Sequence, residues 1–161
     1  MEKLENPSQP VSYYRTHSGN SEFQLLVGML DEDLRIRDGA DHAYYAQFNK
    51  TDKIKYAILA LDQNIPVGCG AIREFSPHSM EVKRMYVLNN RRGEGIATGI
   101  LNELEKWTLE LGKTSCILET GKKQPEALSL YLKNGYRIIP NFGPYLGVEN
   151  SVCFEKFLLK A

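Results

Sequence analysis

The fold is decided by residues 85–98, which read MYVLNNRRGEGIAT. The apolar start of this stretch completes an expected strand over 79–88, and Gly93 and Gly95 follow directly before a helical period begins at Ile96. A chain that leaves a strand, turns through glycines and enters a helix points several N–H groups and the positive helix end at one spot. Glycine also lets the main chain approach an anion without a Cβ in the way. The turn therefore predicts a phosphate site, although glycine turns also serve simply as turns.

The chain on both sides of this turn alternates between helix and strand patterns. Apolar residues recur at helical spacing from Ser21, whereas residues 55–74 have the shorter period of two strands joined by Asp62-Gln63-Asn64. We expect, in chain order, a strand at 11–16, helices at 21–37 and 40–48, strands at 56–61, 66–75 and 79–88, a helix from 96 to Gly112, a strand at 115–118, a helix from Gln124 to Asn134, and strands at 136–139 and 151–158. This order indicates a mixed α/β layer.

The composition narrows the class of protein. At 161 residues, with 42% hydrophobic and 25% charged positions, the chain fits one globular domain, 1–161, with a loose polar tail at 1–10. The 20 basic and 20 acidic residues cancel, so no overall field draws the surface to nucleic acid or to an anionic membrane. No apolar run approaches the ~20 residues of a membrane span, and the three cysteines suit reduced core thiols. We therefore expect a cytoplasmic protein with no nucleic-acid partner and no membrane partner.

Two further motifs flank the turn and make it more specific. Residues 81–87 read EVKRMYV, the turn fits Arg92-x-x-Gly95-x-Ala97, and residues 124–136 read QPEALSLYLKNGY. In this order the motifs resemble the GNAT superfamily of N-acetyltransferases, whose coenzyme A signature is Gln/Arg-x-x-Gly-x-Gly/Ala. The sequence departs from that pattern at Gln124, where many members have asparagine.

The resemblance implies a fold and a cosubstrate. The fold is a single α/β (α+β) domain with a mixed, mostly antiparallel central sheet of about six or seven strands, splayed central strands and helices on both faces. The cosubstrate is acetyl-coenzyme A, with its pantetheine arm along the splayed strand and its pyrophosphate at the turn. The residues implied in holding it are Met85, Tyr86, Val87, Arg91, Arg92, Gly93, Glu94, Gly95, Ile96, Ala97, Thr98, Gln124 and Tyr131.

Acyl transfer to an amine needs a base that neutralises the ammonium group and an acid that protonates the leaving thiolate. The resemblance implies Glu81 as the base and Tyr131 as the acid, whereas the residues alone also allow a solvated glutamate and a core tyrosine. No Cys/His or Ser/His arrangement is legible, and the histidines show no metal-ligand spacing, so we expect no metal and favour direct transfer in a ternary complex. Cys153 is a less favoured nucleophile, since a buried strand thiol is the commoner case.

The acceptor, a primary amine of a small molecule or a peptide, is expected to bind near the early helices, the third strand and the loop before the last strand. The candidate residues are Tyr45, Phe48, Asn49, Arg73 and Tyr145. Arg73 could pair with a carboxylate on the acceptor, although a solvated charge on a hairpin is the more common case.

Two other functions remain open from the sequence. Gly93-x-Gly95-x-x-x-Gly99, followed by a strand that ends in Glu119, also echoes a dinucleotide-binding unit, but the about 40 residues that follow cannot complete two mononucleotide halves. The second alternative is a non-catalytic module that binds acyl-coenzyme A. Strand edges and the apolar last strand are also compatible with a homodimer.

Overall fold

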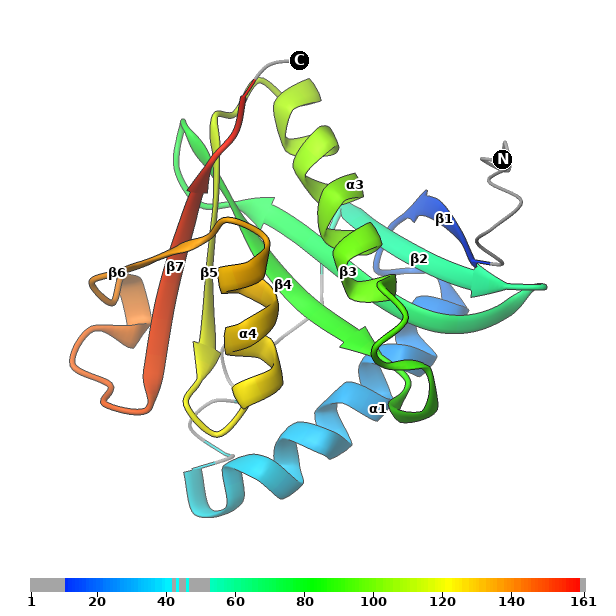
Figure 1. The fold of residues 1–161 in the computed structure, drawn as a ribbon, viewed down its shortest axis with the longest axis horizontal. Coiled ribbons are helices and arrows are strands. Elements are labelled where there is room, and N and C mark those ends of the chain that lie inside the picture. Colours follow the sequence, from blue (N-terminus) through cyan, green and yellow to red (C-terminus); the bar gives the residue numbers. More distant parts are fainter. Residues whose placement is uncertain (1–10, 42, 44–45, 47–52, 160–161) are drawn as a thin grey trace.

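The computed structural model describes residues 11–41, 43, 46 and 53–159 of the chain. They form one seven-stranded sheet in the order β1-β2-β3-β4-β5-β7-β6 (Figure 1). The strands are β1 (Val11–Thr16), β2 (Tyr56–Asp62), β3 (Ile65–Glu74), β4 (Ser79–Val87), β5 (Ser115–Gly121), β6 (Arg137–Ile139) and β7 (Ser151–Phe157). The helices are α1 (Ser21–Asp38), α3 (Ile96–Glu110) and α4 (Pro125–Lys133), with the 3-10 turns η1 (Gly39–Asp41), η2 (Asn89–Arg91) and η3 (Gly143–Tyr145).

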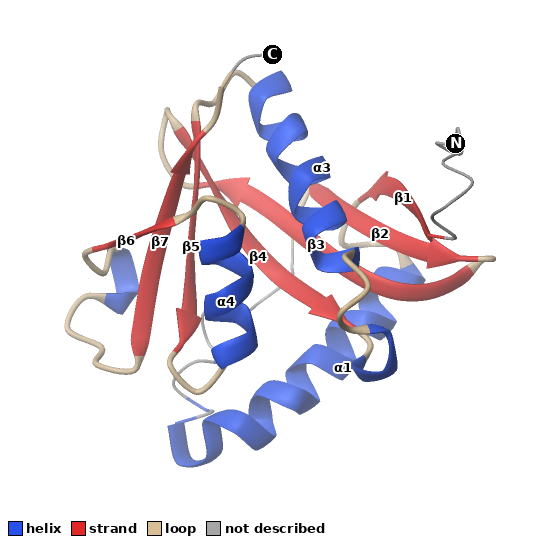
Figure 2. Ribbon diagram, in the orientation of Figure 1, coloured by secondary structure: helices blue, strands red, loops and turns tan. Residues whose placement is uncertain are grey.

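Neighbouring strands run antiparallel except for β4 and β5, which are parallel. Helices cover both faces of the sheet, with α3 and α4 on one face and α1 on the other (Figure 2). The expected fold class is therefore confirmed. The tail at 1–10 and most of the helix expected at 40–48 lie outside the described residues. The strand expected at 115–118 runs on to Gly121, because β7 pairs with it along its whole length.

Local chemistry accounts for the first helix and the first hairpin. Asn20 ends the preceding turn and its Oδ1 accepts a hydrogen bond from the Phe23 amide at 2.9 Å, which satisfies one of the amides at the start of α1. Phe23, Leu26, Val27 and Leu30 then form a buried stripe that packs against β2 and β3. The β2–β3 hairpin turns through Gln63 and Asn64, both with positive φ, as the sequence predicts for a tight turn.

Strand β4 contains a bulge that the sequence does not predict. Cys69 of β3 faces Tyr86 and Ala71 faces Lys83, so Gly70 alone faces two residues, Arg84 and Met85. Arg84 has a φ of 59°, which is rare for a residue with a side chain. A Cβ on Gly70 would lie 2.5 Å from the sulfur of Met85 and 2.7 Å from Cγ2 of Ile100, so these side chains would have to shift to admit one.

The sheet opens between β4 and β5. The two strands pair at three positions, from Ser79 opposite Ser115 to Glu81 opposite Ile117. Beyond this point β4 continues to Val87 and β5 to Gly121, and the two strands diverge (Figure 1). The main chain of β4 from Val82 onward is therefore turned toward a gap rather than toward β5, which confirms the splay that the family resemblance implies.

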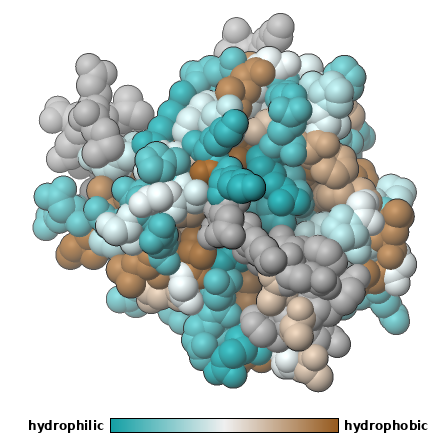
Figure 3. Space-filling model, turned by 180° about the vertical axis from the view of Figure 1, so that it is seen from behind, coloured by the Kyte–Doolittle hydropathy of each residue, from teal (hydrophilic) through white to brown (hydrophobic). Residues whose placement is uncertain are grey.

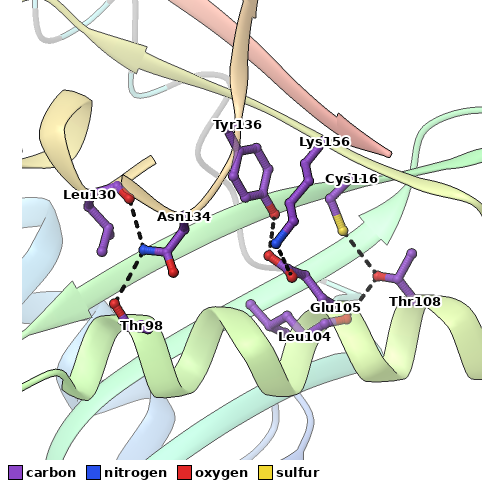
Figure 4. A network of polar contacts seen from close by, with 9 residues as sticks. All are labelled: Thr98, Leu104, Glu105, Thr108, Cys116, Leu130, Asn134, Tyr136 and Lys156. Carbon is purple, nitrogen blue, oxygen red and sulfur yellow. Dashed lines mark hydrogen bonds and ion pairs between the residues drawn. The ribbon is translucent and has the colours of Figure 1, made fainter. Parts of the chain in front are cut away.

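A polar network joins α3 to β7 and to the end of α4 (Figure 4). Glu105 of α3 accepts a hydrogen bond from the Tyr136 hydroxyl at 3.0 Å and pairs with Lys156 of β7 at 2.8 Å. Asn134, at the end of α4, donates to Thr98 of α3 at 3.2 Å. Burial raises the pKa of Tyr136 far above its usual value, so its hydroxyl remains a donor to Glu105.

Replacing Tyr136 with phenylalanine should lower the free energy of unfolding by about 1–3 kcal/mol, because the Glu105 carboxylate loses a buried donor while the ring stays in place. Urea denaturation followed by circular dichroism measures the change. Tyr56→Phe is the matched control, since Tyr56 packs its ring on Trp107, 5.2 Å between centroids, on the same side of the sheet. Equal stabilities of the two variants would contradict a contribution of the Tyr136 hydroxyl.

Candidate functional site

A cavity of about 410 Å³ occupies the opening between β4 and β5. Its wall combines both strands, the turn before α3, one side of α4 and part of α1. Figure 3 shows the molecule from the side opposite to that of Figure 1, and hydrophilic side chains lie near the middle of this face. An ion pair between Arg37 of α1 and Glu126 of α4 joins the two helices beside the cavity. The cavity thus brings the glycine turn, Tyr131 and Glu81 into one site.

The glycine turn has the geometry of an anion cradle. Gly93 and Gly95 have φ values of 82° and 84°, and Gly95 is the N-cap of α3. Among the described residues, no atom lies within 4 Å of the position that a Cβ on either glycine would take, so the space in front of the turn is open. The first amides of a helix have no partner inside the helix, so those of Ile96, Ala97 and Thr98 are suited to an anion at this spot.

The two arginines of the turn have different surroundings. Arg91 pairs with Asp62 at 2.7 Å and with Glu94 at 2.9 Å, and these carboxylates raise its pKa. Arg92 donates from Nε to the Val87 carbonyl at 3.0 Å and also lines the cavity. Arg91 therefore ties the turn to the β2–β3 hairpin, and its positive charge is balanced by two carboxylates.

Helix α4 places Tyr131 in the cavity wall. Pro125 occupies the first turn of the helix and Gln124 precedes it, also in the cavity wall. The Tyr131 ring packs between those of Tyr136 and Phe154, with centroid distances of 5.7 and 5.8 Å. Burial, and then the charge of Glu119, raise the pKa of Tyr131 above its usual value. Its phenol therefore keeps its proton at neutral pH.

Glu81 lies at the closed end of the opening and is only 3% exposed, so it is not a solvated surface glutamate. Arg73 donates from Nε to its Oε1 at 3.1 Å, and the Lys83 ammonium lies 3.8 Å from its Oε2. Burial lowers the pKa of Lys83. Arg73, a candidate for acceptor binding, is half-exposed and engaged with Glu81.

Glu119, which from the sequence alone entered only as the end of a strand in a possible dinucleotide-binding unit, lines the cavity. It lies on β5, in the cavity wall, where Ser151 of β7 donates a hydrogen bond to its Oε2 at 2.7 Å. Burial raises the pKa of Glu119 to about 7. The sequence did not mark Glu119 as a candidate catalytic residue, because the groups that bury it and raise its pKa come from separate segments of the chain.

Of the acceptor candidates, Tyr145 is buried in the cavity wall and lies in η3, before β7. Burial raises its pKa. Tyr45, Phe48 and Asn49 lie outside the described residues. The cavity wall thus includes one of the five acceptor candidates, Tyr145.

The cysteine thiols lie in the interior of the protein. The three cysteines are free and buried, and burial raises the pKa of Cys153 to about 11, so its thiolate is scarce at neutral pH. Within residues 11–41, 43, 46 and 53–159, His, Cys, Asp and Glu side chains form no group that could hold a metal ion. No helix in these ranges combines the length and apolarity needed to cross a bilayer.

Comparison with known proteins agrees with this geometry. Residues 23–136 match the family model described as the acetyltransferase (GNAT) family. An IAA acetyltransferase of Azospirillum brasilense is 39% identical over 100 residues, which are 62% of this chain and 65% of that protein, slightly less than two thirds of its length.

Solved structures agree as well. A Klebsiella pneumoniae protein described as an acyl-CoA N-acyltransferase is similar with a TM-score of 0.77 and 27% identity, over 92% of this chain and 98% of that one. A PaiA N-acetyltransferase of Thermoplasma acidophilum, solved with coenzyme A, shares the fold, with a TM-score of 0.69 and 14% identity over 92% and 99% of the two chains. The chain belongs to the acetyltransferase (GNAT) family.

Proposed function

We propose that this protein is an N-acetyltransferase that moves an acetyl group from acetyl-coenzyme A to a primary amine of a small molecule or a peptide. The observation that carries the proposal is that one cavity joins the glycine turn to Tyr131 and to the carboxylates of Glu81 and Glu119. An anion site, a proton donor and proton acceptors are the groups that this transfer requires. The three buried free thiols suit a reducing compartment such as the cytoplasm.

The described residues fit coenzyme A in three respects. The turn at Gly93 and Gly95 offers open space and helix amides to a pyrophosphate. The main chain of β4 beyond Glu81 faces the opening, where its N–H and C=O groups can pair with the amides of a pantetheine arm. Tyr131 borders the same space, where its phenol can protonate a leaving thiolate.

Direct transfer in a ternary complex fits the buried cysteines better than a covalent acyl-enzyme does. A nucleophilic cysteine needs a lowered pKa, whereas burial raises the pKa of Cys69 to about 12 and that of Cys116 to about 11. We therefore infer that the amine attacks the thioester carbonyl directly, while both substrates are bound.

An acceptor panel tests the proposal. Purified protein with acetyl-coenzyme A is offered amino acids, polyamines, aminoglycosides and peptides, and release of the coenzyme thiol is followed with a thiol reagent. We expect release with at least one class of amine, and mass spectrometry should show the acceptor heavier by one acetyl group. Calorimetric binding of coenzyme A without release for any amine would instead favour a non-catalytic acyl-coenzyme A binding module, and no binding at all would reject both functions.

A further inference from the structure

We propose that Glu119, on β5, is the general base that takes a proton from the acceptor amine, rather than Glu81 on β4. This inference rests on the proposed function and adds a residue to it. Glu119 lies on the β5 side of the opening, in the wall of the cavity that also contains Tyr131. A base in that position can reach an amine that enters the cavity, which is the first requirement for the role.

Glu81 is poorly suited to accept a proton. Its two carboxylate oxygens face two cations, with Arg73 Nε at 3.1 Å from one oxygen and Lys83 Nζ at 3.8 Å from the other. Both oxygens are thus engaged with neighbouring cations. The side chain is also almost fully buried, which restricts an amine's access to it. Glu81 is better placed to hold Arg73 and Lys83 than to take part in proton transfer.

Glu119 has the opposite surroundings. It is partly exposed, and the hydrogen bond that Ser151 donates engages its Oε2. Burial is the largest influence on its pKa and raises it to about 7, and Glu81 and Asp38 of α1 act in the same direction. Lys83 and the Ser151 hydroxyl oppose this rise. Three weaker acids, whose pKa values the Glu119 charge raises, complete its surroundings: Tyr131, Tyr145 and Cys153.

These surroundings give Glu119 the properties that proton removal from an amine requires. Near neutral pH a large fraction of Glu119 is ionised, yet it holds a proton more strongly than an ordinary glutamate does, and this combination suits a general base.

The proposed reaction conserves every proton and every electron pair. Glu119 takes one proton from the ammonium group, which frees the nitrogen lone pair. The nitrogen forms a bond to the thioester carbonyl carbon, the carbon–sulfur bond breaks, and the sulfur leaves with that bond's electron pair and receives the Tyr131 proton. The amide nitrogen and Glu119 then release their extra protons to solvent, and Tyr131 regains one, so the net products are an acetylated amine, the free thiol and one proton.

The test measures the pH profile of kcat/KM with the panel amine that reacts fastest. For the native chain, kcat/KM should rise about tenfold per pH unit and flatten near pH 7. Glu119→Gln should lower kcat/KM at pH 7.5 about 10- to 100-fold and remove the inflection. Ser151→Ala removes the donor that favours the carboxylate, so its inflection should move to higher pH while the plateau is largely kept. Glu119→Asp should keep an inflection at a reduced rate.

Two controls separate this role from a structural one. Glu155 of β7 accepts a hydrogen bond from Ser115 at 3.0 Å and does not line the cavity, so Glu155→Gln should keep the native profile. Calorimetry should show native affinity of Glu119→Gln for coenzyme A. A retained inflection in Glu119→Gln, or its loss in Glu81→Gln, would overturn the assignment. Absence of thiol release by the native chain with every amine would instead overturn the proposed function itself.

Discussion

Replacing Tyr131 with phenylalanine should lower kcat about 10- to 100-fold, while the affinity for coenzyme A is retained. The phenol lies in the cavity wall with a raised pKa and therefore carries a proton at neutral pH. Phenylalanine keeps the ring contacts with Tyr136 and Phe154 but has no proton to give to a leaving thiolate. Steady-state kinetics with a reactive amine measures kcat, and calorimetry measures coenzyme A binding.

The control for Tyr131→Phe is again Tyr56→Phe, which removes a hydroxyl at a residue that does not line the cavity. Its kcat should equal that of the native chain. An unchanged kcat in Tyr131→Phe would remove this residue from the mechanism. A parallel loss of coenzyme A affinity would indicate that the hydroxyl acts in binding rather than in proton transfer.

Replacing Gly95 with valine should weaken coenzyme A binding by about one to two orders of magnitude. A branched residue is strongly disfavoured at the φ of 84° found here, and left-handed backbone costs L-residues about 1–2 kcal/mol even without branching. Each 1.4 kcal/mol corresponds to about tenfold in the dissociation constant. Relief of the strain would turn the amides of Ile96, Ala97 and Thr98 away from their common direction. Calorimetric titration with coenzyme A measures the loss.

The matched control is Gly28→Val in α1. Gly28 is exposed, has no positive φ and, among the described residues, has no atom within 4 Å of a built Cβ. This variant adds the same side chain without strain in the turn, so its affinity for coenzyme A should be native. Native affinity in Gly95→Val would contradict the assignment of the turn to the pyrophosphate.

Local patterns were sufficient to predict much of the fold. The β2–β3 hairpin follows from the residues at its turn, and the start of α3 follows from glycines placed before a helical period. Such features depend on residues that are adjacent in the sequence, so they can be predicted before the fold is known. The splay between β4 and β5 was expected only from the family resemblance, because no local pattern specifies where two parallel strands part.

Features that depend on distant segments were not predictable. The bulge at Arg84 forms opposite Gly70 of the neighbouring strand, and the ion pair of Arg91 requires Asp62 from the hairpin. Glu119 becomes a candidate base only when burial in the cavity wall, with Glu81 and Asp38 nearby, raises its pKa. In each case the bulge, the ion pair or the raised pKa depends on residues that only folding brings together. A single sequence does not show which distant residues become neighbours.

The opening between β4 and β5 also affects how the chain avoids unwanted association. An unpaired strand margin is normally a hazard, because its free main-chain groups can recruit a strand from another molecule. Here the margin lies inside the molecule, in a cavity whose wall includes residues of α1 and α4, and not along the outer boundary of the sheet. A whole foreign strand would have to displace those helices, whereas a slender amide-containing ligand would not. The same unsatisfied backbone can therefore bind a small molecule without inviting aggregation.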